Sequence, residues 1–435
     1  MKKVTCDFSK TGKPIRPHHS MCNYPPRPQT LEAYRGAPDE KGAALIRSLL
    51  KDIDPPFTRL KYPRMCGHGK SIEISSIFRD WDKDENDPDS YYFYSTDMVI
   101  KDSSANGRKI VFRLGVPREL YDNALYVDVK KKISYDKLAT VCSNIVRHVN
   151  GRWNRGISAK VKYWEIWDKP DEKYSFRGSP EDYYELYAAI ATRLKSEHPH
   201  LKVGGPSPSD CSDLTFMKGF LEYVKKHDLP LDFVSWHFTG EDVNDAEAQA
   251  LAIKRLVHAE KLEKRCKIIC TEWNCLTIKE DGRFSVPHAR DIYGASFDAA
   301  FMITMQKLNM DMSFFFDCTR NAPWASFIYP GFFRPYKPLY VFPLYAKLYK
   351  LGKSAKTTIA GRDLYSLAAT DGKKKALLVS SCSDKPNSLE ISGFDGKKRV
   401  YVLDGDRDLT LIAETSDDTV TVPLKGRTVC FVESV

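Results

Sequence analysis

The hydrophobic positions of residues 15–350 fall into short apolar or aromatic runs separated by longer amphipathic stretches. Runs that are apolar at nearly every position are typical of strands covered on both faces, as in a parallel sheet between helices. We interpret as strands the runs at 57–60, 110–114, 162–167, 202–203, 233–237, 267–270 and 312–316. Because strands and helices alternate seven or eight times and no dinucleotide-binding fingerprint is present, the pattern predicts an α/β fold, a (β/α)8 TIM barrel, rather than an open doubly wound sheet.

The stretch that runs from Pro180 toward Lys195 carries the clearest helix signals of the chain. Ser179 can accept a hydrogen bond from a free amide as N-cap, and a proline fits the first helical position. Glu181 and Asp182 favour the positive end of the helix dipole. We therefore expect a helix that begins at residue 180.

Beyond residue 350 the pattern changes to short strands separated by turns that contain Gly, Asp and Ser. The predicted strands lie at 364–369, 376–381, 388–391, 399–403, 419–422 and 428–432. This texture is typical of a small antiparallel sheet structure. We predict a barrel over residues 15–350, a C-terminal antiparallel β-sandwich domain over 351–435, and an N-terminal strand within 1–14 that joins the sandwich.

The composition fits a large folded chain and does not indicate a particular function. Its 435 residues are 42% hydrophobic and 12% aromatic, which is enough for a large core and a second, smaller domain. The net charge is +10, with lysine runs at 130–132 and 373–375. We interpret these runs as solvated faces; a polyanionic glycan is a weaker alternative, and no nucleic-acid-binding module accompanies the charge.

Neither the N-terminus nor the cysteines indicate a membrane or a metal. The first residues turn polar at once, and no run of about 18 apolar residues exists, so we expect no membrane span and a cytoplasmic location. The eleven cysteines form no Cys-x-x-Cys pair, and we interpret them as buried small hydrophobic residues. Cys270 and Cys275 bracket Glu272, but the spacing is not that of a zinc site.

Two predicted strands end in residues that suggest chemistry. Residues 163–171 read Tyr-Trp-Glu-Ile-Trp-Asp-Lys-Pro-Asp, and the apolar run at 268–270 continues as Thr-Glu-Trp-Asn. In a barrel, side chains at the carboxyl ends of the strands line the active-site face. Retaining glycoside hydrolysis needs two carboxyl groups about 5 to 5.5 Å apart, one as nucleophile and one as acid and then base.

These strand ends resemble those of glycoside hydrolase family 39, the β-xylosidases and α-L-iduronidases. In that family the strand corresponding to residues 162–167 typically ends Trp-Asn-Glu-Pro, whose Glu is the acid/base. The strand corresponding to residues 267–270 carries the nucleophile in a Thr/Asn-Glu-Trp setting. The resemblance implies that Glu272 is the nucleophile. It also implies that Asp168 replaces the Asn that contacts the sugar 2-hydroxyl, and that Lys169 replaces the acid/base Glu.

The resemblance extends over nearly the whole chain and implies a set of sugar-binding residues. It includes 12–15, the loop 78–88, 112–115, 235–237 and 335–340. It departs after the second strand, where Arg64-Met65-Cys66-Gly67 stands for the usual Arg-x-His-Asp, and at Thr239, which stands near the place of a Tyr. We expect the substrate-binding residues to be His19, Asn23, Arg64, His68, Trp236, His237, Trp273, Asp317 and Trp324.

Lys169 makes the activity harder to predict than the scaffold. A lysine ammonium is a poor general acid toward an alkoxide, and next to Glu272 it would form an ion pair that lowers the carboxylate's pKa and nucleophilicity. Strict alternation puts Glu165 on the same side as Lys169 but about 13 Å deeper, and puts Asp168 on the other side. Either carboxyl could supply the missing proton, or Lys169 could hold an anionic group of the sugar.

Three functions remain open at this point. The first is a retaining glycosidase with altered machinery that acts on a glycan and needs neither a metal nor an organic cofactor. The second is a catalytically inactive homologue that binds a carbohydrate or a protein partner at the face where active glycosidases bind their substrate. The third and weakest is a barrel reaction in which the amine of Lys169 is the nucleophile. The sequence predicts no oligomeric state.

Overall fold

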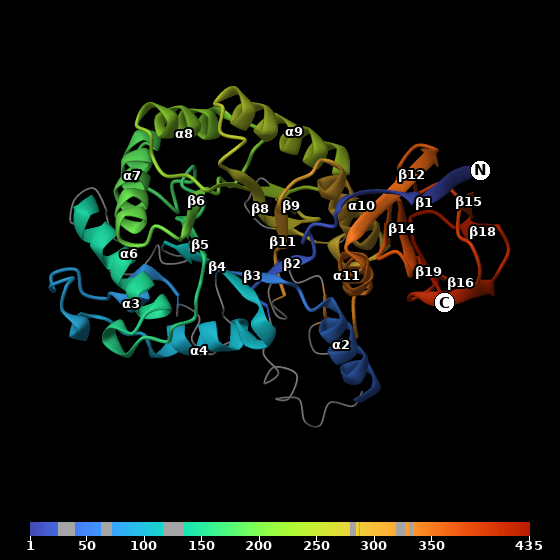
Figure 1. Cartoon of the computed structure of the whole chain (residues 1–435), viewed down its shortest axis with the longest axis horizontal. Coiled ribbons are helices and arrows are strands. Elements are labelled where there is room, and N and C mark those ends of the chain that lie inside the picture. The colour runs from blue at the N-terminus through green and yellow to red at the C-terminus, as the bar shows by residue number, and fades with distance from the viewer. Residues whose placement is uncertain are drawn as a thin grey trace.

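The chain forms a β/α barrel with a large sheet packed beside it (Figure 1). The computed structural model describes residues 1–24, 40–61, 72–115, 134–278, 284–286, 288–318, 327–329 and 334–435. In this part of the chain no helix is long and apolar enough to cross a membrane.

Eight parallel strands close into the barrel in the order β11-β2-β3-β4-β5-β6-β7-β8. The predicted barrel is thus confirmed. The strands are β2 (Ser20–Cys22), β3 (Phe57–Leu60), β4 (Lys109–Leu114), β5 (Tyr163–Ile166), β6 (Lys202–Pro206), β7 (Phe233–Thr239), β8 (Lys267–Asn274) and β11 (Met312–Phe315). All seven runs interpreted as barrel strands are strands, whereas the pattern missed β2, which is only three residues long.

The helices that the structure describes surround the barrel and cover its outer face (Figure 1). They are α2 (Glu40–Ile53), α3 (Ile74–Ile77), α4 (Tyr94–Ser103), α6 (Tyr135–Asn150), α7 (Pro180–Glu197), α8 (Thr215–Lys226), α9 (Val243–Ala259), α10 (Ile292–Lys307) and α11 (Val341–Leu351). Short 3-10 turns are Pro88–Ser90, Ala105–Gly107, Trp153–Arg155, His288–Arg290 and Lys337–Tyr340. Helix α7 begins at Pro180 as predicted, because Ser179 and Asp182 form a reciprocal capping box.

The second sheet has nine strands in the order β17-β16-β19-β14-β13-β12-β1-β15-β18. They are β1 (Lys2–Pro14), β12 (Lys353–Ala360), β13 (Leu364–Thr370), β14 (Lys375–Ser381), β15 (Asn387–Ser392), β16 (Lys398–Leu403), β17 (Thr410–Thr415), β18 (Thr419–Leu424) and β19 (Thr428–Ser434). Neighbours are antiparallel except β1 and β15. The pattern missed β12 and β17, in which nearly all residues are exposed or half-buried. A separate two-stranded ribbon pairs β9 (Thr277–Ile278) with β10 (Phe284–Ser285).

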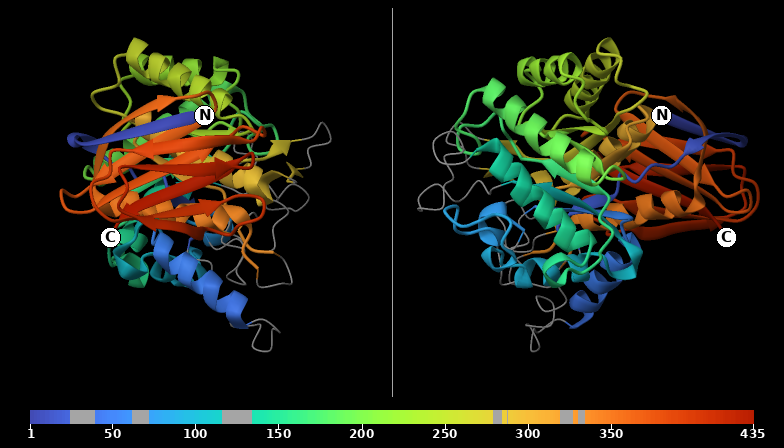
Figure 2. Two further views of the ribbon diagram at one scale, coloured as in Figure 1. Left: turned by 90° about the vertical axis from the view of Figure 1, so that its right-hand side faces the viewer. Right: turned by 60° about the vertical axis from the view of Figure 1, so that its left-hand side comes forward.

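The nine-stranded sheet has two apolar faces with different partners. Alternate residues of β13 show this, because Ala368 belongs to a core enclosed by the sheet itself, whereas Leu367 and Ala369 belong to the core shared with the barrel. Strand β1 lies between β12 and β15, so the first residues of the chain are part of the same sheet. Figure 2 shows the sheet face-on, with the N-terminal strand across it.

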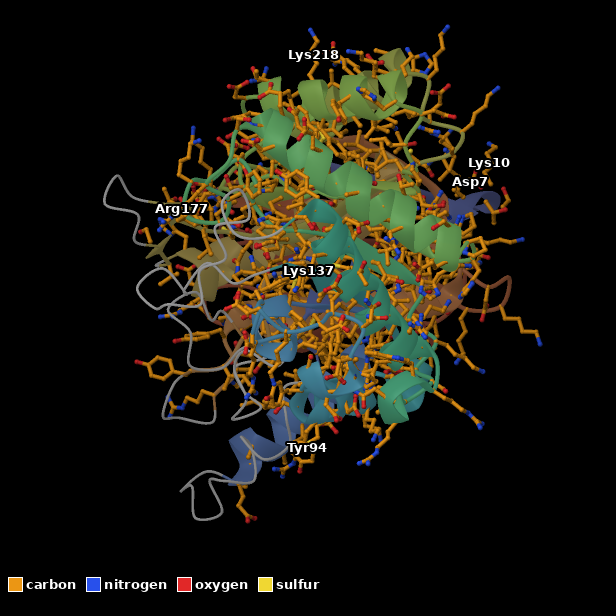
Figure 3. The ribbon with its side chains drawn as sticks, turned by 90° about the vertical axis from the view of Figure 1, so that its left-hand side faces the viewer. Asp7, Lys10, Tyr94, Lys137, Arg177 and Lys218 are labelled. Atoms are coloured by element: carbon orange, nitrogen blue, oxygen red, sulfur yellow. The ribbon has the colours of Figure 1, made fainter. Side chains whose placement is uncertain are left out.

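The positive charge of the described surface lies mostly on side chains that point into solvent. Lys218 and Lys10 project outward in Figure 3, and Lys10 pairs with Asp7 at 3.0 Å. Of the lysine run at 373–375, the first two residues are exposed and Lys375 pairs with Asp395 at 2.5 Å. The run at 130–132 lies outside the described residues.

Candidate active site

Arg59, on β3, lies at the centre of a buried group of charges at the carboxyl ends of the barrel strands. Its side chain is fully buried, and its Nε donates to Glu165 at 2.6 Å, its Nη1 to Glu272 at 2.6 Å and its Nη2 to Asp168 at 2.8 Å. One guanidinium thus bridges carboxylates from β5, from the loop after β5 and from β8. Such forked, charge-assisted contacts fix the positions of all three carboxylates.

Two lysines complete this group. The ammonium of Lys61 contacts both Asp168, at 3.0 Å, and Glu272. The ammonium of Lys169 lies 3.5 Å from Oε2 of Glu272. The ion pair between Lys169 and Glu272 that the sequence predicted is therefore present. We call the six residues the ion-pair cluster: Arg59, Lys61, Glu165, Asp168, Lys169 and Glu272.

The end of β5 brings Asp168 and Lys169 to the same cluster as Glu165, which strict alternation did not predict. The strand ends at Ile166, and Trp167 has φ 70° while Lys169 has φ 52°. These left-handed conformations break the period of two. The indole of Trp167 turns away, where it donates to the carbonyl of Ser175 at 3.1 Å. The prediction that Asp168 and Lys169 lie on opposite sides, with Glu165 far below them, was therefore wrong.

A β-bulge in β8 turns Glu272 into the barrel. Trp236 of β7 faces Cys270 of β8, yet the next residue of β7, His237, faces Glu272, so Thr271 is an extra residue. Ile269 lies in the barrel interior and Cys270 in the outer core. Alternation without the bulge would direct Glu272 outward, and a bulge re-aims the side chains that follow it.

His237 and Ser207 stand beside the carboxylates. The Oγ of Ser207 and Nε2 of His237 are 2.6 Å apart, and the ring lies 3.7 Å from Glu272 and 3.8 Å from Asp168. Burial lowers the pKa of His237 well below its usual value, so its ring is neutral at pH 7. His237 can therefore exchange hydrogen bonds with a hydroxylated ligand without adding charge.

The charges of the ion-pair cluster keep the carboxylates of Glu272 and Asp168 ionised. Burial by itself raises the pKa of Glu272, but the surrounding cations, Lys61 first, outweigh it and hold this pKa well below its usual range. Burial also opposes ionisation of Asp168, and Lys61 and Arg59 lower its pKa well below the usual range. Neither carboxyl carries a proton near neutral pH.

A second pair of predicted residues lies next to the cluster. The amide of Asn23, after β2, donates to Asp317, after β11, at 3.0 Å. The side-chain oxygen of Asn23 accepts from the backbone amide of Lys61 at 3.1 Å. Asn23 and Asp317 thus border the cluster, where a ligand over Lys61 would meet them.

Three predicted sugar-binding residues lie elsewhere, and these predictions were wrong. His19 comes before β2, at the opposite end of that strand, and packs on Tyr345 and Tyr349. Trp236 and Trp273 are fully buried in the core between barrel and helices. Their strand neighbours His237 and Glu272 face inward, so the indoles face outward. The predicted Arg64, His68 and Trp324 lie outside the described residues.

The sequence reasoning missed Arg59 and Lys61, although a signal was there. Two basic residues at alternate positions end a buried strand, Phe-Thr-Arg-Leu-Lys, and buried cations need carboxylate partners. It also missed a neighbouring buried pair, in which Arg113 of β4 donates to Glu73. Burial raises the pKa of Glu73 to about 7 despite that partner.

The geometry of three side chains would suit a metal ion, but their charges are already compensated. Ligand atoms of Asp168, His237 and Glu272 lie within 4.8 Å of one another. The carboxylate oxygens already accept from Arg59 and Lys61. A divalent cation would have to displace these ammonium and guanidinium groups, so the donor set fits ion pairs better than a metal.

Known proteins resemble this chain in sequence and in fold. The sequence profile described as "Glycosyl hydrolases family 39" matches residues 3–317. A β-xylosidase of Caldicellulosiruptor saccharolyticus is 27% identical over 236 residues, which is 49% of this chain and 45% of that relative. A β-xylosidase of Geobacillus stearothermophilus is 26% identical over 205 residues, 45% of this chain and 40% of that relative. The matched region therefore spans less than half the length of these curated relatives.

Solved structures share the whole architecture. A glucosidase from Croceicoccus marinus superposes with a TM-score of 0.75 at 22% identity, covering 100% of this chain and 99% of that chain. A GH39 β-xylosidase from Caulobacter crescentus superposes with a TM-score of 0.71 at 15% identity, covering 99% of both chains. These likenesses support the barrel with its attached sheet.

Proposed function

Because the chain belongs to family 39 of the glycosyl hydrolases, we propose that it acts on a glycoside by a retaining mechanism in which Glu272 is the nucleophile. We further propose that the carboxylic acid of this mechanism has been lost. The supporting geometry is a carboxylate near the end of β8 that faces inward and is ionised. Retaining glycosidases place such a nucleophile about 5 to 5.5 Å from the acid.

The observation that carries the proposal is the contact between Lys169 and Glu272 at 3.5 Å. The residue that directly follows Asp168 reaches the candidate nucleophile, as an acid/base group must, but it ends in an ammonium. Its side chain is 14% exposed, the most of any residue in the ion-pair cluster. A glycosidic oxygen bound over Glu272 would therefore meet an amine instead of a carboxylic acid.

Neither nearby carboxyl is suited to replace the missing acid. Asp168 is ionised, because Lys61 and Arg59 hold its pKa well below the usual range. Glu165 is fully buried beneath Arg59, where its carboxylate accepts from Nε at 2.6 Å. A general acid must be protonated and within hydrogen-bond reach of the leaving oxygen, and each of these groups fails one condition.

The mechanism that follows depends on the leaving group. An oxygen of Glu272 attacks the anomeric carbon, and the bond from that carbon to the leaving oxygen breaks. A phenolate leaves without help, whereas an alkoxide needs a proton that Lys169 supplies poorly. Water then attacks the glycosyl-enzyme and releases Glu272, slowly because the neighbouring carboxylate of Asp168, stabilised in its ionised form by Lys61 and Arg59, is a weak base for its proton.

A binding protein is the second candidate function, and the contacts that already surround Glu272 favour it. Arg59, Lys61 and Lys169 all contact Glu272, whose side chain is only 6% exposed. To attack a sugar, Glu272 would have to give up its ion pairs with three cations, which costs a large amount of free energy. In that case the cleft holds a glycan through groups such as His237 and Asn23 without cleaving it.

A panel of glycosides separates the two candidates. We expect turnover of 2,4-dinitrophenyl β-xyloside or β-glucoside, no measurable turnover of alkyl glycosides, and loss of activity in Glu272→Ala. Azide should accelerate turnover and yield the glycosyl azide of retained configuration, because it needs no general base. A dinitrophenyl uronide tests whether Lys169 instead holds an anionic sugar. Absence of turnover with every substrate, together with saturable sugar binding, would establish the binding protein.

A further inference from the structure

A cavity of about 700 Å³ opens at the end of the barrel opposite to the ion-pair cluster. Its wall includes Phe57, Lys109 and Tyr163, which are the first residues of β3, β4 and β5. The cluster lies toward the other ends of these parallel strands and shares no residue with the cavity wall, and Arg59 comes two residues, about 7 Å, after Phe57. The cavity is therefore separate from the proposed active site, and its volume is typical of a small-molecule site.

The charged groups around the cavity are of one sign. Among the fifteen described residues that line it, five are basic and none is acidic. The guanidinium of Arg108 is engaged elsewhere, since it donates to the carbonyl of Pro55 at 3.0 Å and pairs with Asp54. The remaining four basic residues are the exposed lysines Lys101, Lys109, Lys160 and Lys162.

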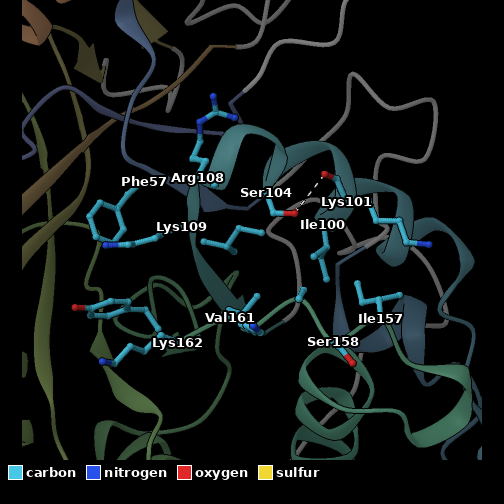
Figure 4. A pocket seen from close by; sticks show the side chains of 15 residues that line it. Phe57, Ile100, Lys101, Ser104, Arg108, Lys109, Ile157, Ser158, Val161 and Lys162 are labelled. Carbon is cyan, nitrogen blue, oxygen red and sulfur yellow. Dashed lines mark hydrogen bonds between the residues drawn. The ribbon is translucent and has the colours of Figure 1, made fainter.

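These four lysines form no ion pair with a carboxylate of the described residues, unlike many other lysines of the chain. Lys109 lies instead over the ring of Phe57, 5.3 Å from its centre. Figure 4 shows Lys101 and Lys162 at opposite sides of the cavity. Four positive charges around one concave surface, without a carboxylate partner among the described residues, create a field that concentrates anions.

Between the lysines the cavity wall is apolar. Ile100, Ile110, Ile157 and Val161 contribute aliphatic surface, and Phe57 and Tyr163 contribute rings. An apolar floor beneath a charged rim suits a ligand with a body of sugar size and an oxyanion at its edge. Ser104 and Ser158 add hydroxyl groups at the wall.

We propose that this cavity binds a sugar-sized ligand that carries a phosphate or sulfate group, held in the positive field of Lys101, Lys160 and Lys162. Phosphate and sulfate esters share the tetrahedral oxyanion that ammonium groups recognise. The site is independent of Glu272, so it serves as a second ligand site on a barrel that carries its proposed chemistry at the other end.

Calorimetric titration of the full chain tests the proposal. The probes are glucose 6-phosphate, glucose 6-sulfate, inorganic phosphate and free glucose, at low salt. We expect saturable binding of at least one ester, weaker binding of inorganic phosphate and none of glucose. Replacing Lys101, Lys160 and Lys162 by Gln should weaken ester binding at least tenfold. The preferred ester identifies the oxyanion.

A charge-matched control removes three exposed lysines of the nine-stranded sheet and its turns, Lys13, Lys373 and Lys374, again by Gln. It should change ester affinity less than twofold, which separates a local site from the overall field. Equal losses in both triple variants, no saturable binding of either ester, or binding of free glucose would each overturn the proposal. Equal affinity for inorganic phosphate and the esters would overturn the role of the apolar floor.

Discussion

At the scale of single residues, the exchange of a carboxyl for an ammonium at position 169 has two effects on Glu272. It removes the proton donor, and it adds a positive charge 3.5 Å from the nucleophile's Oε2. Burial opposes ionisation of Glu272, yet the neighbouring cations hold its pKa well below the usual range. A carboxylate so strongly stabilised is a weaker nucleophile.

Restoring the acid should therefore restore catalysis. In Lys169→Glu, alone or with Asp168→Asn, we expect hydrolysis of an alkyl xyloside or uronide to become measurable, with kcat/KM at least about a hundredfold above the detection limit for the unmodified chain, the usual worth of a positioned acid. Lys169→Met is the matched control, because it removes the charge without adding a carboxyl. If Glu and Met give the same kcat/KM, the acid is not what the site lacks.

Arg59 should be needed for stability as well as for the site. Arg59→Met leaves Glu165, Asp168 and Glu272 without their shared guanidinium, and breaking a buried ion pair costs about 3 to 5 kcal/mol. Urea unfolding measures this loss. The double variant Arg59→Met with Glu165→Gln should recover part of it, since one uncompensated charge is gone. A double variant less stable than the single one would contradict the account.

Glu73 should give stability a measurable pH dependence. Burial raises its pKa to about 7 from the usual glutamate value of 4.5, so the folded chain holds a proton that the unfolded chain has lost. Between pH 4.5 and 7 this group's contribution to the free energy of unfolding falls as pH rises, by at most about 1.4 kcal/mol per pH unit. The Glu73→Gln variant should lose this slope. An unchanged slope between pH 4.5 and 7 would exclude Glu73 as its source.

At the scale of elements, strand ends and irregularities place the chemistry. The left-handed Trp167 ends β5, and the bulge at Thr271 turns β8, so that carboxylates from both strands reach one guanidinium. Helix α7, which follows the β5 loop, is fixed at its start by the capping box of Ser179 and Asp182. Regular elements thus hold the irregular ends in place.

The cap of α7 should contribute measurably to stability. The side chain of Ser179 accepts from the amide of Asp182 at 3.2 Å, and Ser179→Ala should cost about 1 kcal/mol in urea unfolding. Ser196→Ala near the other end of the helix is the control. Its hydroxyl only donates to the carbonyl of Arg193, and its loss should change stability by less than about 0.5 kcal/mol. Equal effects of the two variants would argue against the capping box.

At the scale of the whole molecule, the barrel and the nine-stranded sheet share one hydrophobic core. Helix α10 is buried along nearly its whole length, because the barrel covers one side and β13, β14 and β19 cover the other. Leu378 and Phe431 of the sheet belong to the same core as the barrel's outer layer. The sheet is therefore part of the barrel's support.

This shared core predicts that damage in the sheet destabilises the barrel. All seven tryptophans lie between residues 81 and 324, so their fluorescence reports on the barrel alone. Leu378→Ala should shift the fluorescence-detected unfolding by about 2 to 5 kcal/mol. Leu411→Ala, at a side chain that is 47% exposed in β17, should have little effect. An unchanged tryptophan transition in Leu378→Ala would mean that the two parts unfold independently.

The sequence by itself determined the barrel, the attached sheet and the proximity of residues 169 and 272. Strands covered on both faces are apolar throughout, and parallel strands bring their carboxyl ends to one side of the barrel. These regularities follow from local periodicity. For the same reason the pattern did not predict β2, β12 and β17, since the first is very short and the other two have almost no fully buried residue.

Only the tertiary structure decided which side chains meet. A positive φ at Trp167 and one extra residue in β8 each shift the side-chain alternation, and neither is encoded in the hydrophobic pattern. The pairing of Arg59 with carboxylates 106 and 213 positions away depends on barrel closure. The same closure turns Trp236 and Trp273 outward into the core, because the inward positions beside them are taken by His237 and Glu272.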